Sequence, residues 1–67
     1  MSNFVPIYTF YNFSSAKLAK TLLDAEGIES QLISEYMGVL YQGVIGIRMH
    51  VLENDLVRAL ELLEIEI

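Results

Sequence analysis

Apolar residues recur every three or four positions between Asn12 and Gly27, which predicts one amphipathic helix. Asn12 is a suitable N-cap and Ser14 an alternative, because their side-chain oxygens can accept bonds from otherwise unpaired backbone N–H groups. Gly27 follows the last turn, where a residue without Cβ adopts the left-handed conformation at little cost. The spacing places Leu18, Leu22 and Ala25 on the buried face, flanked by Ala16, Ala19 and Leu23.

Three segments rich in β-branched and aromatic residues predict strands at residues 4–10, 28–34 and 45–52. In the last of these, alternation directs Ile47, Met49 and Val51 to the core and the residues between them to the other face. Asn54, as cap, and Asp55 then begin a second helix. Its buried stripe contains Leu56, Ala59, Leu60 and Leu63.

The predicted order is βαββα, with residues 64–67 open to two interpretations, a short fourth strand or a frayed end. This order predicts an α+β fold, a ferredoxin-like split βαβ sandwich whose antiparallel sheet carries both helices on one face. The 67 residues form a single domain, 1–67. The expected core packs Leu18, Leu22, Leu56, Leu60 and Leu63 against Ile47, Met49 and Val51.

The composition of the chain limits the kinds of partner that it can bind. The chain is 54% hydrophobic, more than so short a domain buries easily, which favours a homo-oligomer. It has no Cys and one His, so we expect no disulfide, metal site or cofactor. A net charge of −5 disfavours nucleic acid and anionic membranes. No apolar run has transmembrane length and no targeting segment is evident, so the expected location is cytoplasmic.

The segment 35–46 has neither helical nor strand periodicity and is predicted to be an apolar, glycine-punctuated loop. A loop that only met water would be polar, so this one either folds back on its own sheet or docks on another chain. Glu35 has a simpler interpretation as a turn-capping carboxylate, and the glycines as turn residues. The candidate contact residues are Glu35, Tyr36, Met37, Gly38, Leu40, Tyr41 and Gly43.

Arg48 and His50 are the other candidate binding residues, on the face of the sheet away from the helices. If the second and third strands pair, they lie near Glu29 and Gln31, as a solvated or interfacial cluster. The alternative is a catalytic His with a carboxylate partner. One His without an evident nucleophile argues against an enzyme.

Five stretches of the sequence carry a resemblance to a known family. They are the Tyr8-Thr9 strand entering Asn12, the helix AKLAKTLLDAEGI, Glu35 with glycines beyond it, the strand GIRMHV and the helix DLVRALELL. Over nearly its whole length the chain resembles a small prokaryotic family described as putative signal-transducing proteins. The resemblance implies a fold similar to PII-type nitrogen signal proteins. In those proteins the loop between strands two and three contacts partners, and the subunits trimerise. It implies no ligand, because no nucleotide-binding motif matches theirs.

Three functions remain open. The first is a non-enzymatic binding or regulatory module that acts through residues 35–46 or the open sheet face, with a protein as the partner. The second is a structural self-association domain without a ligand, in which the apolar loop and residues 64–67 pair chains. The third is a small enzyme using His50.

Overall fold

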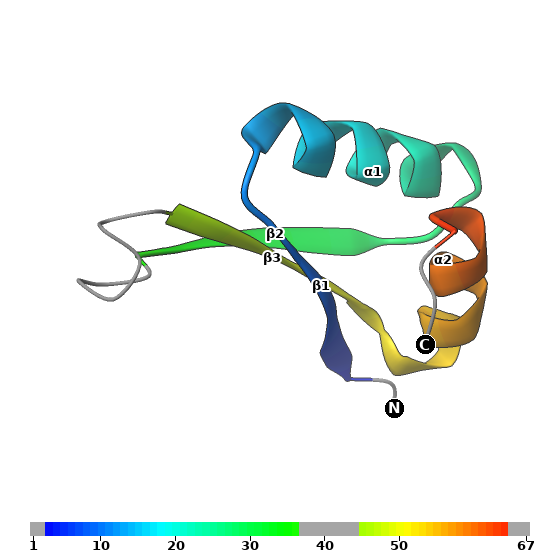
Figure 1. Cartoon of the computed structure of the whole chain (residues 1–67). Coiled ribbons are helices and arrows are strands. Elements are labelled where there is room, and N and C mark those ends of the chain that lie inside the picture. The colour runs from blue at the N-terminus through cyan, green and yellow to red at the C-terminus, as the bar shows by residue number, and fades with distance from the viewer. Residues whose placement is uncertain (1–2, 37–44, 65–67) are drawn as a thin grey trace.

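The computed structural model describes residues 3–36 and 45–64. Figure 1 shows a small α+β domain with the βαββα order and ferredoxin-like arrangement that the sequence predicted. The elements are β1 (Phe4–Phe10), α1 (Phe13–Ala25), β2 (Ser30–Tyr36), β3 (Ile45–Leu52), the 3₁₀ turn η2 (Glu53–Asp55) and α2 (Leu56–Leu62).

Within the described residues the sheet has three strands in the order β1-β3-β2, and β3 runs antiparallel to both neighbours. The register shifts between Pro6 and Tyr8, so Pro6 pairs with His50 and Tyr8 with Met49, leaving Ile7 as an extra residue. Such a bulge increases the local twist. Pro6 lies in a strand at the edge of this sheet, where a missing N–H is tolerated.

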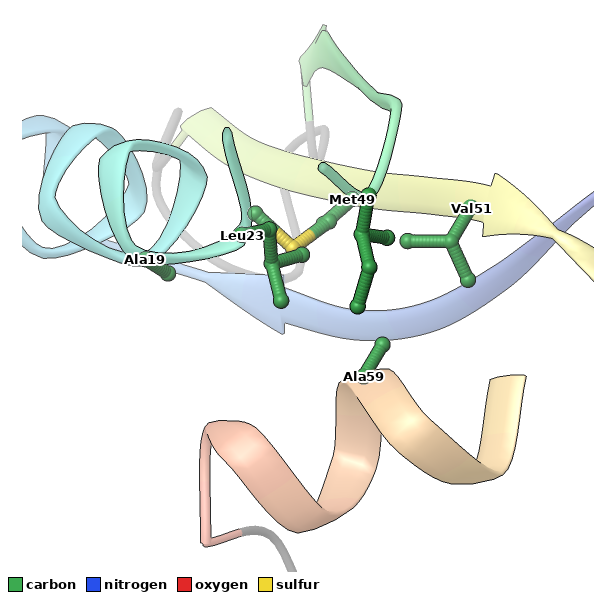
Figure 2. Close-up of a cluster of buried hydrophobic side chains, with 6 residues drawn as sticks. Ala19, Leu23, Met49, Val51 and Ala59 are labelled. Carbon is green, nitrogen blue, oxygen red and sulfur yellow. The ribbon is translucent and has the colours of Figure 1, made fainter. Parts of the chain in front are cut away.

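Both helices pack on one face of the sheet, as predicted. Figure 2 shows Ala19 and Leu23 of α1 and Ala59 of α2 gathered over Met49 and Val51 of β3. All five are buried. The remaining partly buried apolar residues around this cluster are Ile7, Phe10, Leu32, Leu56, Leu62 and Leu63. The opposite face of the sheet carries no described helix (Figure 1).

The predicted inner face of α1 is wrong. Leu18 and Leu22 are 62% and 48% exposed, and Ala25 is also exposed. The helix instead turns Ala16, Ala19 and Leu23 inward, and these residues are buried. Two alanines allow the helix backbone to approach the sheet closely, and Leu23 packs in the same buried cluster as Met49. Both stripes are apolar, so periodicity alone did not decide between them.

The caps of α1 are confirmed, whereas the start of the second strand differs from the prediction. Asn12 Oδ1 accepts the Ser15 N–H at 3.1 Å, and Gly27 has φ +75°. Strand β2 begins at Ser30 rather than at residue 28. The reason is that the Ile28 N–H is used to close the end of α1, donating to the Leu23 carbonyl at 2.9 Å.

Asn54 is not the cap of the second helix. It lies inside η2, and α2 begins at Leu56 with Asp55 in the cap position and no side-chain bond. The predicted stripe of α2 is otherwise present. Ala59 and Leu60 are buried, while Leu56 and Leu63 pack against the core from its edge.

Candidate functional site

The face of the sheet away from the helices carries apolar and basic residues with polar residues between them. Residues paired across antiparallel strands share a face, so the pair Phe4–Leu52 is followed by Pro6–His50–Gln31 and then by Thr9–Arg48–Ile33. Ile33 is 44% exposed, whereas Arg48 and His50 are half-buried. We call Phe4, Pro6, Ile33, Arg48, His50 and Leu52 the uncovered strip.

His50 has no partner suited to acid–base chemistry at its register position. Its neighbours across the strands are Pro6 and Gln31, neither of which is a carboxylate. Its Nδ1 atom is buried and makes no hydrogen bond with the described residues. The expected nearby carboxylate, Glu29, precedes β2 and has no pairing partner in the described part of the sheet. The described geometry therefore supplies no dyad through which His50 could act as a base.

Of the segment 35–46, the structure describes only the two ends. Glu35 and Tyr36 belong to β2, where their backbones pair with Gly46 and Ile45 of β3. Gly46 is buried within that strand. The prediction that the loop begins at Glu35 is thus wrong, because the β ladder continues through both residues. The predicted contact residues Met37, Gly38, Leu40, Tyr41 and Gly43 lie outside the described residues.

A second surface, which the sequence did not reveal, lies on the helix side of the sheet. It is an open groove of about 750 Å³ between α1, the helix-facing side of β1 and the end of α2. Tyr8 and Phe10 meet there edge to face, with ring centroids 4.8 Å apart. The lining consists of Tyr8, Phe10, Ser15, Leu18, Ala19, Leu22, Leu62, Leu63 and Glu64. We call it the helix-side groove. The signal for it in the sequence is the stripe of Leu18 and Leu22 on α1, which periodicity alone assigns to the core.

Two of the four Lys and Arg side chains link the helices to neighbouring segments by hydrogen bonds. Lys20 Nζ donates to the Ser30 carbonyl at 3.1 Å and lies 3.5 Å from Asp24, which ties α1 to the start of β2. Arg58 Nη2 donates to the Glu26 carbonyl at 3.0 Å, which joins α2 to the end of α1. Neither cation is part of the lining of the groove.

In residues 3–36 and 45–64, no three His, Asp or Glu side chains come together in a way that could hold a metal ion. Of the helices that the structure describes, none has the length and apolar character needed to cross a bilayer.

The fold and its two surfaces define a small ferredoxin-like α+β domain with an uncovered sheet face and an apolar groove. The family model described as "putative prokaryotic signal transducing protein" matches residues 4–66. The chain belongs to this family. No curated protein and no solved structure matches it significantly. The similarity to PII-type proteins stays a prediction.

Proposed function

We propose that the chain is a non-enzymatic binding or regulatory module of a prokaryotic signalling system, and that it contacts a protein partner through the uncovered strip and residues 35–46 beyond it. The observation that carries the proposal is the composition of the strip. If this face of the sheet met only water, the strands would place polar residues on it, in alternation with the apolar residues of the core face. This face presents four apolar residues, Phe4, Pro6, Ile33 and Leu52, among the polar residues Thr9, Gln31, Arg48 and His50.

That combination suits a protein interface better than a small-molecule site. Aromatic residues and Arg are enriched at the centres of interfaces, where they exclude water from a nearly flat surface. The strip follows strands β1, β3 and β2 from one side of the sheet to the other. The family description supports a role in signal transduction. A cytoplasmic location belongs to the same proposal, as does the involvement of Glu35, Tyr36, Met37, Gly38, Leu40, Tyr41 and Gly43.

The test is site-specific photo-crosslinking in a prokaryotic cell that expresses the chain. A photoreactive residue replaces Gln31, which is exposed beside His50, and in a matched variant it replaces Val57, which is 58% exposed on α2. We expect an adduct of one defined mass from position 31 and none from position 57. Adding Ile33→Glu should abolish the adduct, because a carboxylate would be buried in the interface. Equal adducts from both positions, or none from position 31, would contradict the proposal.

Self-association without a ligand is the second candidate. Among the described residues, seven large apolar side chains are exposed, including Tyr11, Phe13 and Ile33. Surface of this kind is removed from water when chains pair. In the crosslinking experiment, an adduct of twice the mass of the chain would identify this function, whereas an adduct with another protein would identify the first.

A further inference from the structure

The helix-side groove has the shape of a docking site for a helix. One wall is formed by α1 from Ser15 to Leu22, about two turns or roughly 10 Å of helix. Tyr8 and Phe10 of β1 form another wall, and Leu62 and Leu63 form the end. Leu18 and Leu22 keep about half or more of their surface exposed here, although α1 had a second stripe with which to pack on the sheet.

One residue in this lining is held in an unfavourable backbone conformation. Glu64 follows α2 with φ +57°, in the left-handed region, and its N–H donates to the Glu61 carbonyl at 3.1 Å. Glycine is the usual residue at such a helix end, and any L residue with a side chain costs about 1–2 kcal/mol more there. The chain has a glutamate at this position, and Glu64 is one of the residues that line the groove.

The charges around the groove indicate which charge its occupant should carry. Glu64 is the one charged residue in the lining, as far as the described residues show. Lys20 and Arg58 are directed to Ser30 and Glu26, Arg48 lies on the opposite face of the sheet, and Lys17 is exposed on α1 outside the lining. A second copy of this chain, with its net charge of −5, would bring another acidic surface to the groove. A cationic occupant is favoured on electrostatic grounds.

We propose that the helix-side groove docks an amphipathic helix of another protein, whose apolar side chains lie between Leu18, Leu22 and Phe10 and whose Lys or Arg pairs with Glu64. A helix satisfies its own backbone hydrogen bonds, so it can enter an apolar groove that offers few polar partners. Apolar side chains at positions i, i+3 or i+4, and i+7 of the docked helix would extend along the two turns of α1 that form the wall of the groove. The inference rests on the proposed function in taking a protein as the partner, but it uses the other side of the sheet.

The test measures fluorescence anisotropy with a labelled peptide of about 14 residues, built from Leu and Lys so that Leu forms one helical stripe. Two control peptides are matched to it. One replaces every Lys by Glu, and the other keeps the composition but scrambles the order. We expect the Lys peptide alone to bind. Equal binding of the scrambled peptide or of the Glu peptide would overturn the proposal.

Variants of the protein then locate the site. Leu22→Ser, and separately Leu18→Ser, should weaken binding of the Lys peptide about tenfold, because each removes an apolar contact without opening the core. Glu64→Gln should weaken it about three- to tenfold and flatten its salt dependence. Val57→Ser, an equally exposed change elsewhere on α2, should leave binding unchanged. Unchanged binding in both leucine variants would overturn the proposal, with circular dichroism confirming that each variant is folded.

Other occupants have distinct signatures. A dimer whose mass falls to that of one chain in Leu22→Ser would identify a second copy as the occupant and overturn the proposal. Peptide binding that appears only when the chain is cut after Glu64 would do the same, by identifying residues 65–67 as the occupant. Ile33→Glu disrupts the uncovered strip and should not change peptide binding, so failure of the groove and failure of the proposed function are distinguishable.

Discussion

Two residues in the left-handed region mark the ends of the two helices, and they differ in kind. At the end of α1 the residue is Gly27, with φ +75°, and at the end of α2 it is Glu64, with φ +57°. Glycine adopts the left-handed conformation without steric cost. Glutamate adopts it at a cost, and we interpret the difference as a sign that the Glu64 side chain has a role in the groove.

Gly27→Ala should lower the free energy of unfolding by about 1–2 kcal/mol. Nothing lies within 4 Å of a Cβ built at this position, so the cost is backbone strain rather than a clash. Urea unfolding followed by circular dichroism measures it. Gly27→Asn should cost less, because Asn tolerates the left-handed region better. Equal costs for Ala and Asn would show that strain is not the cause.

Glu64→Gly should raise the free energy of unfolding by roughly 0.5–1 kcal/mol. The gain is the relieved strain of about 1–2 kcal/mol, reduced by the larger entropy of glycine in the unfolded chain. The same variant should bind the Lys peptide more weakly than the natural sequence. A stability that does not rise would mean that the Glu64 carboxylate stabilises the fold by contacts that offset the strain.

At the level of the elements, the strands β1 and β3 and the caps of α1 could be predicted from the sequence, but the rotation of α1, the bounds of β2 and the start of α2 could not. The boundaries of β1 and β3 follow from local composition, and Asn12 and Gly27 have strong local preferences. Which face of a helix is buried depends on which other segments of the chain pack against it. Because α2 ends at Leu62, it leaves Leu18 and Leu22 beside an open groove.

The neighbouring leucines of α1 test this correction directly. Leu23 is fully buried, and Leu22 is 48% exposed. Leu23→Ala should cost about 2–5 kcal/mol of unfolding free energy, because it leaves a cavity above Met49. Leu22→Ala should cost under about 1 kcal/mol. Chemical denaturation compares them.

Leu23→Ala removes a large share of the stability of so small a domain and can leave it unfolded. Leu23→Met then serves as the second variant, with an expected cost below about 1.5 kcal/mol because the volume is conserved. Similar costs for the two alanine variants would contradict the observed rotation of α1.

At the scale of the whole molecule, the sequence pointed to one of the two surfaces. Alternation along β3 was enough to place Arg48 and His50 together on the uncovered face. The groove could not be found in this way, because it forms where β1, α1 and the end of α2 meet. Although β1 and α1 are neighbours in the chain, the end of α2 is far from both, and none of these segments carries a motif that indicates the others.

Self-association is the prediction that depends on the whole surface. Exposed apolar side chains outside the helix-side groove include Ile33 in the uncovered strip and Tyr11 and Phe13 beside the start of α1. Burying such a side chain fully contributes about 1.5–3 kcal/mol, which a few contacts can set against the mutual repulsion of acidic chains. We expect light scattering across a dilution series to give two or three times the 7.6 kDa of one chain.

Charge variants would then show which face the copies share. Ile33→Glu should reduce the mass to that of one chain if the uncovered strip is the interface, because it places a carboxylate in an apolar contact. Val57→Glu adds the same charge on α2 and is the matched control, expected to leave the mass unchanged. The mass of a single chain at every concentration would contradict self-association. Such a result would leave the uncovered strip available to a different protein.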